Sequence, residues 1–224
     1  MSLIELINIS KFYKSEGERV AALNGLDLSI EGGEFIAVMG PSGSGKSTFL
    51  NILGGLSHPS EGELRVDGID IYQLKREKLA DYRREYIGFV FQSFHLIPYL
   101  TVLENVMLPL VIIPSRNGHQ KEQATGALHR VGLAEKARRL PNQLSGGEQE
   151  RVAIARALVN SPPIILADEP TGNLDSATGK EIMSLLEDLN SEGQTIIMVT
   201  HNPENARFAN RIIRLQDGCV QSDI

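Results

Sequence analysis

Cysteine, positive charge and long apolar runs are all scarce in this chain of 224 residues. The single cysteine, Cys219, excludes an internal disulfide framework and suits a reducing compartment. Acidic residues outnumber basic ones by 28 to 22, so the chain lacks the basic excess that usually marks a nucleic-acid-binding protein. We therefore expect no nucleic-acid partner.

The chain also lacks the roughly 20 continuous apolar residues that a membrane-spanning helix needs. Its most apolar region, 96–114, is interrupted by Glu104, Asn105, Pro109 and Pro114. The first residues have no basic segment followed by a long apolar run, as a secretion signal would. We expect a chain that does not itself cross a membrane.

Short apolar runs alternate with helical patterns along most of the chain. The runs at 35–40, 87–91, 163–168 and 195–200 are typical of strands buried on both faces, and helical spacing marks 46–56, 76–86, 176–190 and 203–209. Residues 95–160 carry mostly helical patterns. The sequence predicts an α/β fold with a mainly parallel sheet and an inserted helical lobe.

The stretch "GPSGSGKST" fits G-x-x-x-x-G-K-[ST] and lies between a predicted strand and a predicted helix, the context that supports a phosphate-binding loop. Glycines let successive N–H groups turn inward, and the helix N-terminus adds partial positive charge. Lys46 would reach the β- and γ-phosphates and Ser47 would bind Mg²⁺. The alternative is a flexible turn. The candidate residues are Gly40, Pro41, Ser42, Gly43, Ser44, Gly45, Lys46, Ser47 and Thr48.

The run "IILADEP" places two carboxylates at the end of a predicted buried strand. Asp168 is placed to hold Mg²⁺, and Glu169 to orient and polarise water for attack on a γ-phosphate. Without the phosphate-binding loop, the pair could simply be a solvated strand end.

The stretch "QLSGGEQERVAIARAL" begins a predicted helix with two glycines, each of which costs about 1 kcal/mol relative to alanine. Ser145 and Glu148 form a predicted capping box, which satisfies the first backbone donors. That pairing leaves Gly146 and Gly147 unexplained.

Together these motifs resemble the nucleotide-binding subunit of an ATP-binding-cassette (ABC) transporter, over essentially the whole chain and in the family's order. The resemblance implies an ATP hydrolase that uses ATP and Mg²⁺. It also implies a P-loop NTPase (RecA-like) core with an antiparallel β subdomain and an α-helical subdomain. We expect a single domain over 1–224, with the core in 1–92 and 160–224 and the helical signature subdomain in 93–159.

The resemblance assigns further roles. Gln92 would contact Mg²⁺ or the attacking water, His201 would be the switch histidine, and Asp175 would lie in the D-loop. Tyr13 would stack on adenine. With Lys46 and Glu169, Gln92 and His201 complete the catalytic set. Taken singly, the glutamine could be a strand-end polar residue, the histidine a satisfied hydrogen-bonding group and the tyrosine a packed aromatic.

The resemblance also implies that two subunits dimerise head to tail on binding ATP. Ser145, Gly146, Gly147 and Glu148 of one subunit would then close over the nucleotide held by the other. Because glycine has no Cβ, the backbone could approach the γ-phosphate closely.

Transport would require a separate integral membrane permease, and the ATPase would lie in the cytoplasm, peripheral on the inner face of the membrane. Segment 93–114 is a candidate docking face, or else the core of the helical lobe. The motifs are most similar to bacterial ATPases of lipoprotein release, macrolide export and cell division, whose permeases have large extracytoplasmic domains. Glu150 stands where glutamine is usual and Asn202 where aspartate is common.

The main alternative is a soluble ABC-type ATPase that is not coupled to transport. Against it stand the acidic charge and the short stretch between Gln92 and the signature, which leaves no room for a long coiled-coil arm. A P-loop kinase would not need the signature, and an ATP-gated scaffold would not need Glu169.

Overall fold

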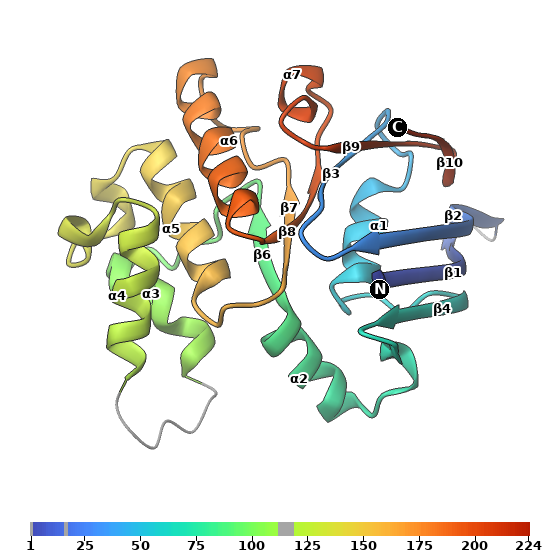
Figure 1. Cartoon of the computed structure of the whole chain (residues 1–224), viewed down its shortest axis with the longest axis horizontal. Coiled ribbons are helices and arrows are strands. Elements are labelled where there is room, and N and C mark those ends of the chain that lie inside the picture. The colour runs from blue at the N-terminus through green and yellow to red at the C-terminus, as the bar shows by residue number, and fades with distance from the viewer. Residues whose placement is uncertain (1, 16–17, 112–118) are drawn as a thin grey trace.

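Two sheets organise the chain, and the larger one runs between two groups of packed elements (Figure 1). The computed structural model describes residues 2–15, 18–111 and 119–224. Within these residues, the larger sheet has six strands in the order β10-β9-β3-β8-β7-β6 and the smaller has four in the order β2-β1-β4-β5.

The larger sheet is mainly parallel, as predicted. Five strands run parallel and β10 pairs antiparallel with β9 at one edge. The strands are β3 (Phe35–Met39), β6 (Ile87–Phe91), β7 (Ile164–Asp168), β8 (Thr195–Val199), β9 (Arg211–Gln216) and β10 (Cys219–Asp223). The sequence analysis did not identify β10, because its polar residues lack an apolar run.

The smaller sheet is antiparallel in every pairing, which confirms the expected β subdomain. Its strands are β1 (Ser2–Ser15), β2 (Glu18–Glu31), β4 (Glu61–Val66) and β5 (Ile69–Asp70). Register shifts interrupt the pairing of β1 with β2, so this long ribbon is irregular.

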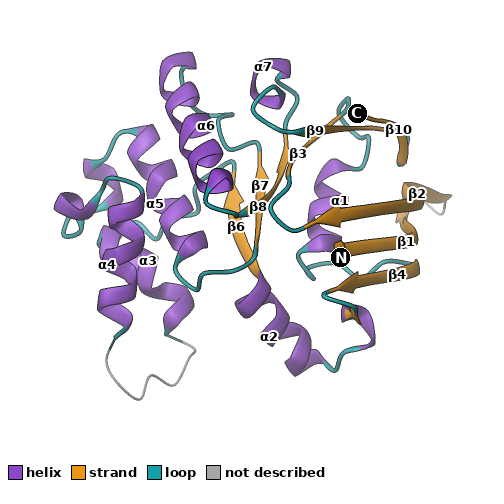
Figure 2. Ribbon diagram, viewed as in Figure 1, coloured by secondary structure: helices purple, strands orange, loops and turns teal. Residues whose placement is uncertain are grey.

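Figure 2 shows helices on both sides of the larger sheet, with α3, α4 and α5 together on one side and α1 beside the smaller sheet on the other. The helices are α1 (Lys46–Leu53), α2 (Arg76–Tyr86), α3 (Val102–Met107), α4 (Gln120–Arg130), α5 (Gly146–Leu158), α6 (Ser176–Ser191) and α7 (Pro203–Ala206). Two are shorter than predicted. Gly54 and Gly55 end α1, the latter with a φ of 65°, and α7 stops at Ala206.

The strands of the larger sheet bury side chains on both faces. In β3, Phe35 and Ala37 belong to the core shared with α5 and α6, whereas Ile36 and Val38 belong to the core shared with α1 and the smaller sheet. Alternation along one strand thus feeds two cores, which is why these strands read as continuous apolar runs.

Segment 93–114 divides between the two roles considered for it. Val102, Val106 and Leu110 are buried in the core of the helical lobe, whereas Tyr99 is 78% exposed and Val111 is 68% exposed. Residues 112–114 lie outside the described residues. No helix in the described part of the chain is long and apolar enough to cross a membrane.

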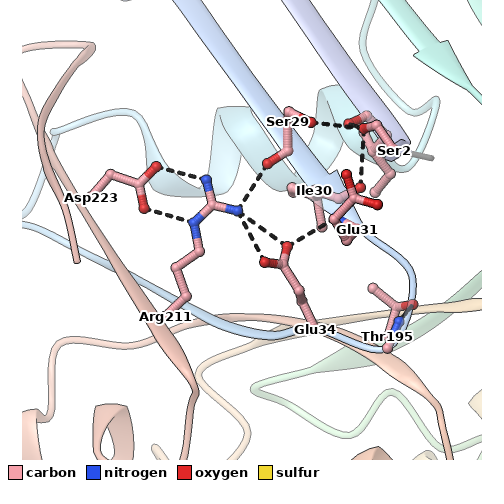
Figure 3. A network of polar contacts seen from close by, with 10 residues as sticks. Ser2, Ser29, Ile30, Glu31, Glu34, Thr195, Arg211 and Asp223 are labelled. Carbon is pink, nitrogen blue, oxygen red and sulfur yellow. Dashed lines mark hydrogen bonds and ion pairs between the residues drawn. The ribbon is translucent and has the colours of Figure 1, made fainter.

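Arg211 on β9 holds the C-terminal strand to the β2–β3 turn (Figure 3). Its Nε and Nη2 donate to the two carboxylate oxygens of Asp223, both at 2.7 Å. Its Nη1 donates to the carbonyl oxygen of Ser29 at 2.9 Å and to Glu34 Oε2 at 3.1 Å. The guanidinium therefore joins segments 182 residues apart in sequence.

Candidate functional site

The predicted functional side chains meet at the carboxyl ends of the parallel strands. The phosphate-binding loop follows β3, Gln92 follows β6, Asp168 ends β7 and His201 lies just beyond β8. Loops at this edge of an open α/β sheet are where such folds bind ligands. They surround a cavity of about 610 Å³ lined by Ala22, Gly40, Pro41, Ser42, Gly43, Gly45, Lys46, Ser47, Thr48, Gln92, Asp168, Glu169, Val199 and His201.

The phosphate-binding loop has the backbone that its glycines permit. Gly43 has a φ of 80° and Gly45 a φ of 99°, both in the left-handed region. A Cβ on Gly45 would also lie 2.2 Å from the carbonyl oxygen of Ala22. Helix α1 follows with no side-chain cap and no acidic residue in its first turn, so its N–H groups face an anion unopposed.

Two polar groups of the loop await a ligand. The Lys46 ammonium donates to the carbonyl oxygens of Gly40 and Pro41, each at 2.8 Å, and so lies across the loop. The hydroxyl oxygen of Ser44 is buried and has no hydrogen-bond partner among the described residues. A phosphate would give the ammonium a stronger acceptor than a carbonyl.

Asp168, Ser47 and Gln92 bring oxygen donors to one wall of the cavity. Burial raises the pKa of Asp168 and the neighbouring Glu169 raises it further, while Lys46 and a hydrogen bond from Ser47 lower it. The described residues contain no group of three or more His, Cys, Asp or Glu that could hold a metal alone. This donor set fits Mg²⁺, which protein sites bind through one or two carboxylates plus substrate phosphates.

Glu169 and His201 are already in contact. His201 Nδ1 lies 2.7 Å from Glu169 Oε1, and the His201 backbone N–H donates to the same oxygen at 3.0 Å. Because an ionised carboxylate only accepts hydrogen bonds, Nδ1 carries the proton here. Thr200, which sequence reasoning missed, donates to Glu169 Oε2 at 3.4 Å. Glu169 itself has a φ of 49°, a strained value that aims its side chain into the cavity.

The loop after Gln92 is tied to the turn before the D-loop. Asn173 Nδ2 donates to the Gln92 carbonyl oxygen at 2.7 Å, and a Cβ on Gly172 would lie 2.8 Å from Gln92 Nε2. Sequence reasoning missed both residues, although the "TGN" turn after the paired carboxylates was a visible signal.

The predicted capping box at the start of α5 is confirmed. The Glu148 N–H donates to Ser145 Oγ at 3.3 Å, and the Ser145 N–H donates to Glu148 Oε2 at 3.0 Å. Gly147 is buried, and a Cβ there would lie 2.3 Å from Thr178 Cγ2 on α6. Close packing of α5 on α6 therefore supplies a reason for this glycine that the sequence analysis had not identified.

Several predicted residues lie outside the cavity within one chain. Among the described residues, those lining it include neither Tyr13, nor Asp175, nor any of 145–148. Tyr13 is 44% exposed, with Lys11 Nζ 5.2 Å from its ring centroid. Asp175 caps α6 by accepting from the N–H groups of Ala177 and Thr178, both at 3.0 Å.

Glu150 is the least expected feature of α5. Its side chain is fully buried, and neither carboxylate oxygen has a hydrogen-bond partner among the described residues. Burial raises its pKa to about 8, against an opposing effect of Arg156. Arg156 itself donates to the carbonyl oxygens of His95 and Phe94 at 2.6 and 2.7 Å.

Comparison with known proteins supports this geometry. The ABC transporter family model matches residues 23–172. The uncharacterized ABC transporter ATP-binding protein MJ0796 of Methanocaldococcus jannaschii is 53% identical, over 99% of this chain and 96% of that protein. The macrolide export ATP-binding/permease protein MacB of Bdellovibrio bacteriovorus is 49% identical over 99% of this chain, which spans only 34% of that longer protein.

Solved structures agree. A dimeric post-hydrolysis state of the cassette MJ0796 bound to ADP and Pi has a TM-score of 0.89, with 50% identity over 99% of this chain and 97% of that one. The cbiO1 protein of Clostridium perfringens, part of the ABC transporter complex cbiONQ, also has a TM-score of 0.89, at 29% identity over 99% and 88% of the chains. The expected membership is confirmed: this chain belongs to the ABC transporter family, as an ATP-binding cassette that hydrolyses ATP.

Proposed function

We propose that two copies of this chain close head to tail over two ATP molecules, each copy contributing the signature residues 145–148 to the nucleotide held by the other. The observation that carries this proposal is that these residues lie outside their own chain's nucleotide cavity. The solved dimers of the similar cassette MJ0796 also support it. In the closed state the glycine N–H groups at the start of α5 would face the γ-phosphate.

Within one site, Lys46 would exchange its two carbonyl partners for phosphate oxygens, and Tyr13 would stack on adenine. Ser47, Asp168 and Gln92 would hold Mg²⁺ together with the phosphates. The bound ion would neutralise charge on the phosphates as it builds up during hydrolysis. Asp175 would lie in the D-loop at the junction of the two copies.

Glu169 would orient the attacking water and accept its proton. His201 bridges to the same carboxylate and is 73% exposed, so a ligand entering the cavity can readily draw it away. Catalysis therefore needs a rearrangement in which His201 moves towards the γ-phosphate and frees a Glu169 oxygen for water. Closure of the second copy would provide it.

For the output, we propose that the dimer drives a separate integral membrane permease with a large extracytoplasmic domain, in lipoprotein release, export or mechanotransmission. The cassette would then lie in the cytoplasm on the inner face of the membrane. Support comes from the MacB relatives, which are named as ATP-binding/permease proteins. A second cavity, of about 460 Å³ between β6, α2 and α5, offers a docking groove lined in part by Arg83, Arg84 and Arg156. Residues 93–159 would transmit the motion.

The two-copy site is tested with Glu169→Gln, which keeps the shape of the side chain and removes its proton acceptor. We expect ATP to trap this variant as a dimer in analytical ultracentrifugation and ADP to leave it monomeric. A second test introduces Ser42→Cys and Ser145→Cys into a chain carrying Cys219→Ser. Both positions are exposed, and ATP should promote a covalent dimer. Absence of the dimer and of the crosslink under every nucleotide condition would exclude the proposal.

The permease proposal needs its own test. Affinity purification from detergent-solubilised membranes should recover an integral membrane protein in a fixed ratio with the cassette. Arg84→Glu, which reverses a charge in the docking groove, should lower that recovery, whereas Arg65→Glu on the smaller sheet should not. Equal recovery with the two variants would count against docking at this groove.

A further inference from the structure

Glu148, in the first turn of α5, has a cationic partner from another element. The Lys136 ammonium, at the end of the short helix Ala134–Lys136, pairs with Glu148 Oε1, while Oε2 accepts from the Ser145 N–H. The two side chains are 38% and 25% exposed, so the pair is partly shielded from water. Lys136 and the Ser145 N–H together hold the pKa of Glu148 below its ordinary range, so the carboxylate is ionised at neutral pH.

An ionised carboxylate at this position opposes a phosphate ligand. The N-terminal end of a helix attracts anions through its first N–H groups, and a carboxylate in the first turn uses part of that attraction. The Glu148 N–H is already taken by Ser145 Oγ, which leaves the N–H groups of Gly146 and Gly147 without an intrahelical acceptor. A bare negative charge beside these two groups would repel a triphosphate.

We propose that Lys136 is a positioning residue for the nucleotide site formed between two copies, because it cancels the charge of Glu148 while holding that side chain in its capping geometry. This inference rests on the proposed head-to-tail dimer. It gives Lys136, which lies outside the signature in sequence, control over how strongly the start of α5 attracts the partner's ATP. The pair works as a unit: the glutamate caps the helix, and the lysine prevents the cap from repelling the ligand.

The test is a double-mutant cycle built on the Glu169→Gln chain, with ATP-driven dimerisation measured by analytical ultracentrifugation. Lys136→Met should weaken ATP binding at each shared site about tenfold. Because a symmetric dimer has two such sites, the dimer dissociation constant should rise about a hundredfold. Lys136→Arg, which keeps the charge, should stay close to the parent chain. Lys121→Met, an exposed lysine on α4 of the same lobe, is the matched control for net charge.

The background carrying Glu148→Gln separates the charge mechanism from a structural one. Whatever that substitution does alone, adding Lys136→Met to it should change the dissociation constant less than about twofold, since no carboxylate remains to be neutralised. A Lys136→Met deficit that persists undiminished in that background would show a structural role and overturn the inference. Equal behaviour of Lys136→Met and Lys121→Met would overturn it as well.

The same variants in the chain with Glu169 intact give a kinetic readout. Lys136→Met should raise KM for ATP and its salt sensitivity, with a smaller change in kcat. If the parent Glu169→Gln chain stays monomeric with ATP, the head-to-tail proposal itself fails. If the parent dimerises and the cycle shows no coupling, only the role of Lys136 fails.

Discussion

Replacing Glu150 with glutamine should make the protein more stable at neutral pH, although the substitution removes a charged group from the middle of a helix. In the native state the carboxyl is fully buried without a hydrogen-bond partner among the described residues, and its pKa is raised by burial from 4.5 to about 8. The folded protein therefore keeps this group protonated at pH 7, whereas the unfolded chain releases the proton. Folding must take that proton up from solution.

The size of the effect follows from the pKa difference. Between an unfolded pKa of 4.5 and pH 7, stability is lost at about 1.4 kcal/mol per pH unit, or about 3 kcal/mol in all. Because the folded pKa lies above the unfolded one, the penalty is absent below pH 4.5, grows as the pH rises and levels off above about 8. Glutamine carries no proton to take up, so Glu150→Gln should gain about 3 kcal/mol at pH 7 and less than about 1 kcal/mol at pH 5.

Urea unfolding followed by circular dichroism at pH 5, 6, 7 and 8 measures this difference directly. Glu187→Gln, on the exposed side of α6, makes the same chemical change in contact with water and is the control. Its effect should stay within about 0.5 kcal/mol at every pH. A Glu150→Gln gain that does not grow between pH 5 and pH 8 would refute the reasoning, and so would a loss of stability at pH 7.

Three further outcomes follow from the structure. Gly147→Ala should lower stability by about 1–3 kcal/mol, since its Cβ would lie 2.3 Å from Thr178 Cγ2, and adding Thr178→Ser should restore most of it; urea unfolding without nucleotide separates this packing effect from ligand binding. Arg211→Met should destabilise the chain by about 1–3 kcal/mol, because two charge-assisted hydrogen bonds to Asp223 are lost. Since Arg211 holds the pKa of Asp223 below its ordinary value, this contribution should disappear as the pH falls through the folded pKa, and equal losses at pH 7 and pH 2.5 would contradict it. Lys46→Ala should abolish ATP binding in isothermal titration calorimetry, and unchanged affinity would contradict the assignment of the phosphate-binding loop.

The sequence predicted the parts of the site that depend on local pattern. A phosphate-binding loop is contiguous, and its glycines, lysine and serine must follow one another between a strand and a helix. Asp168 and Glu169 were found for the same reason, since a buried strand reads as an unbroken apolar run and its end is visible. The capping box of Ser145 and Glu148 is equally local.

Features that join distant segments were not predictable from one sequence. Thr178 explains Gly147 only once α6 packs on α5, and Lys136 reaches Glu148 only once its short helix folds against the signature. The burial of Glu150 was hidden because charged residues in helices usually face water. Strand β10 is polar and depends on pairing with β9 and on the ion pair between Arg211 and Asp223, neither of which leaves a periodic signal.

The Lys46 ammonium, resting on two carbonyl oxygens of its own loop, has a consequence for the speed of nucleotide exchange. The cation already organises the ring of backbone dipoles, so an arriving triphosphate finds a preshaped receptor and swaps acceptors around a stationary charge. No segment has to refold before capture, and none has to collapse after departure. Turnover of this motor should then be paced by the meeting and parting of its two halves.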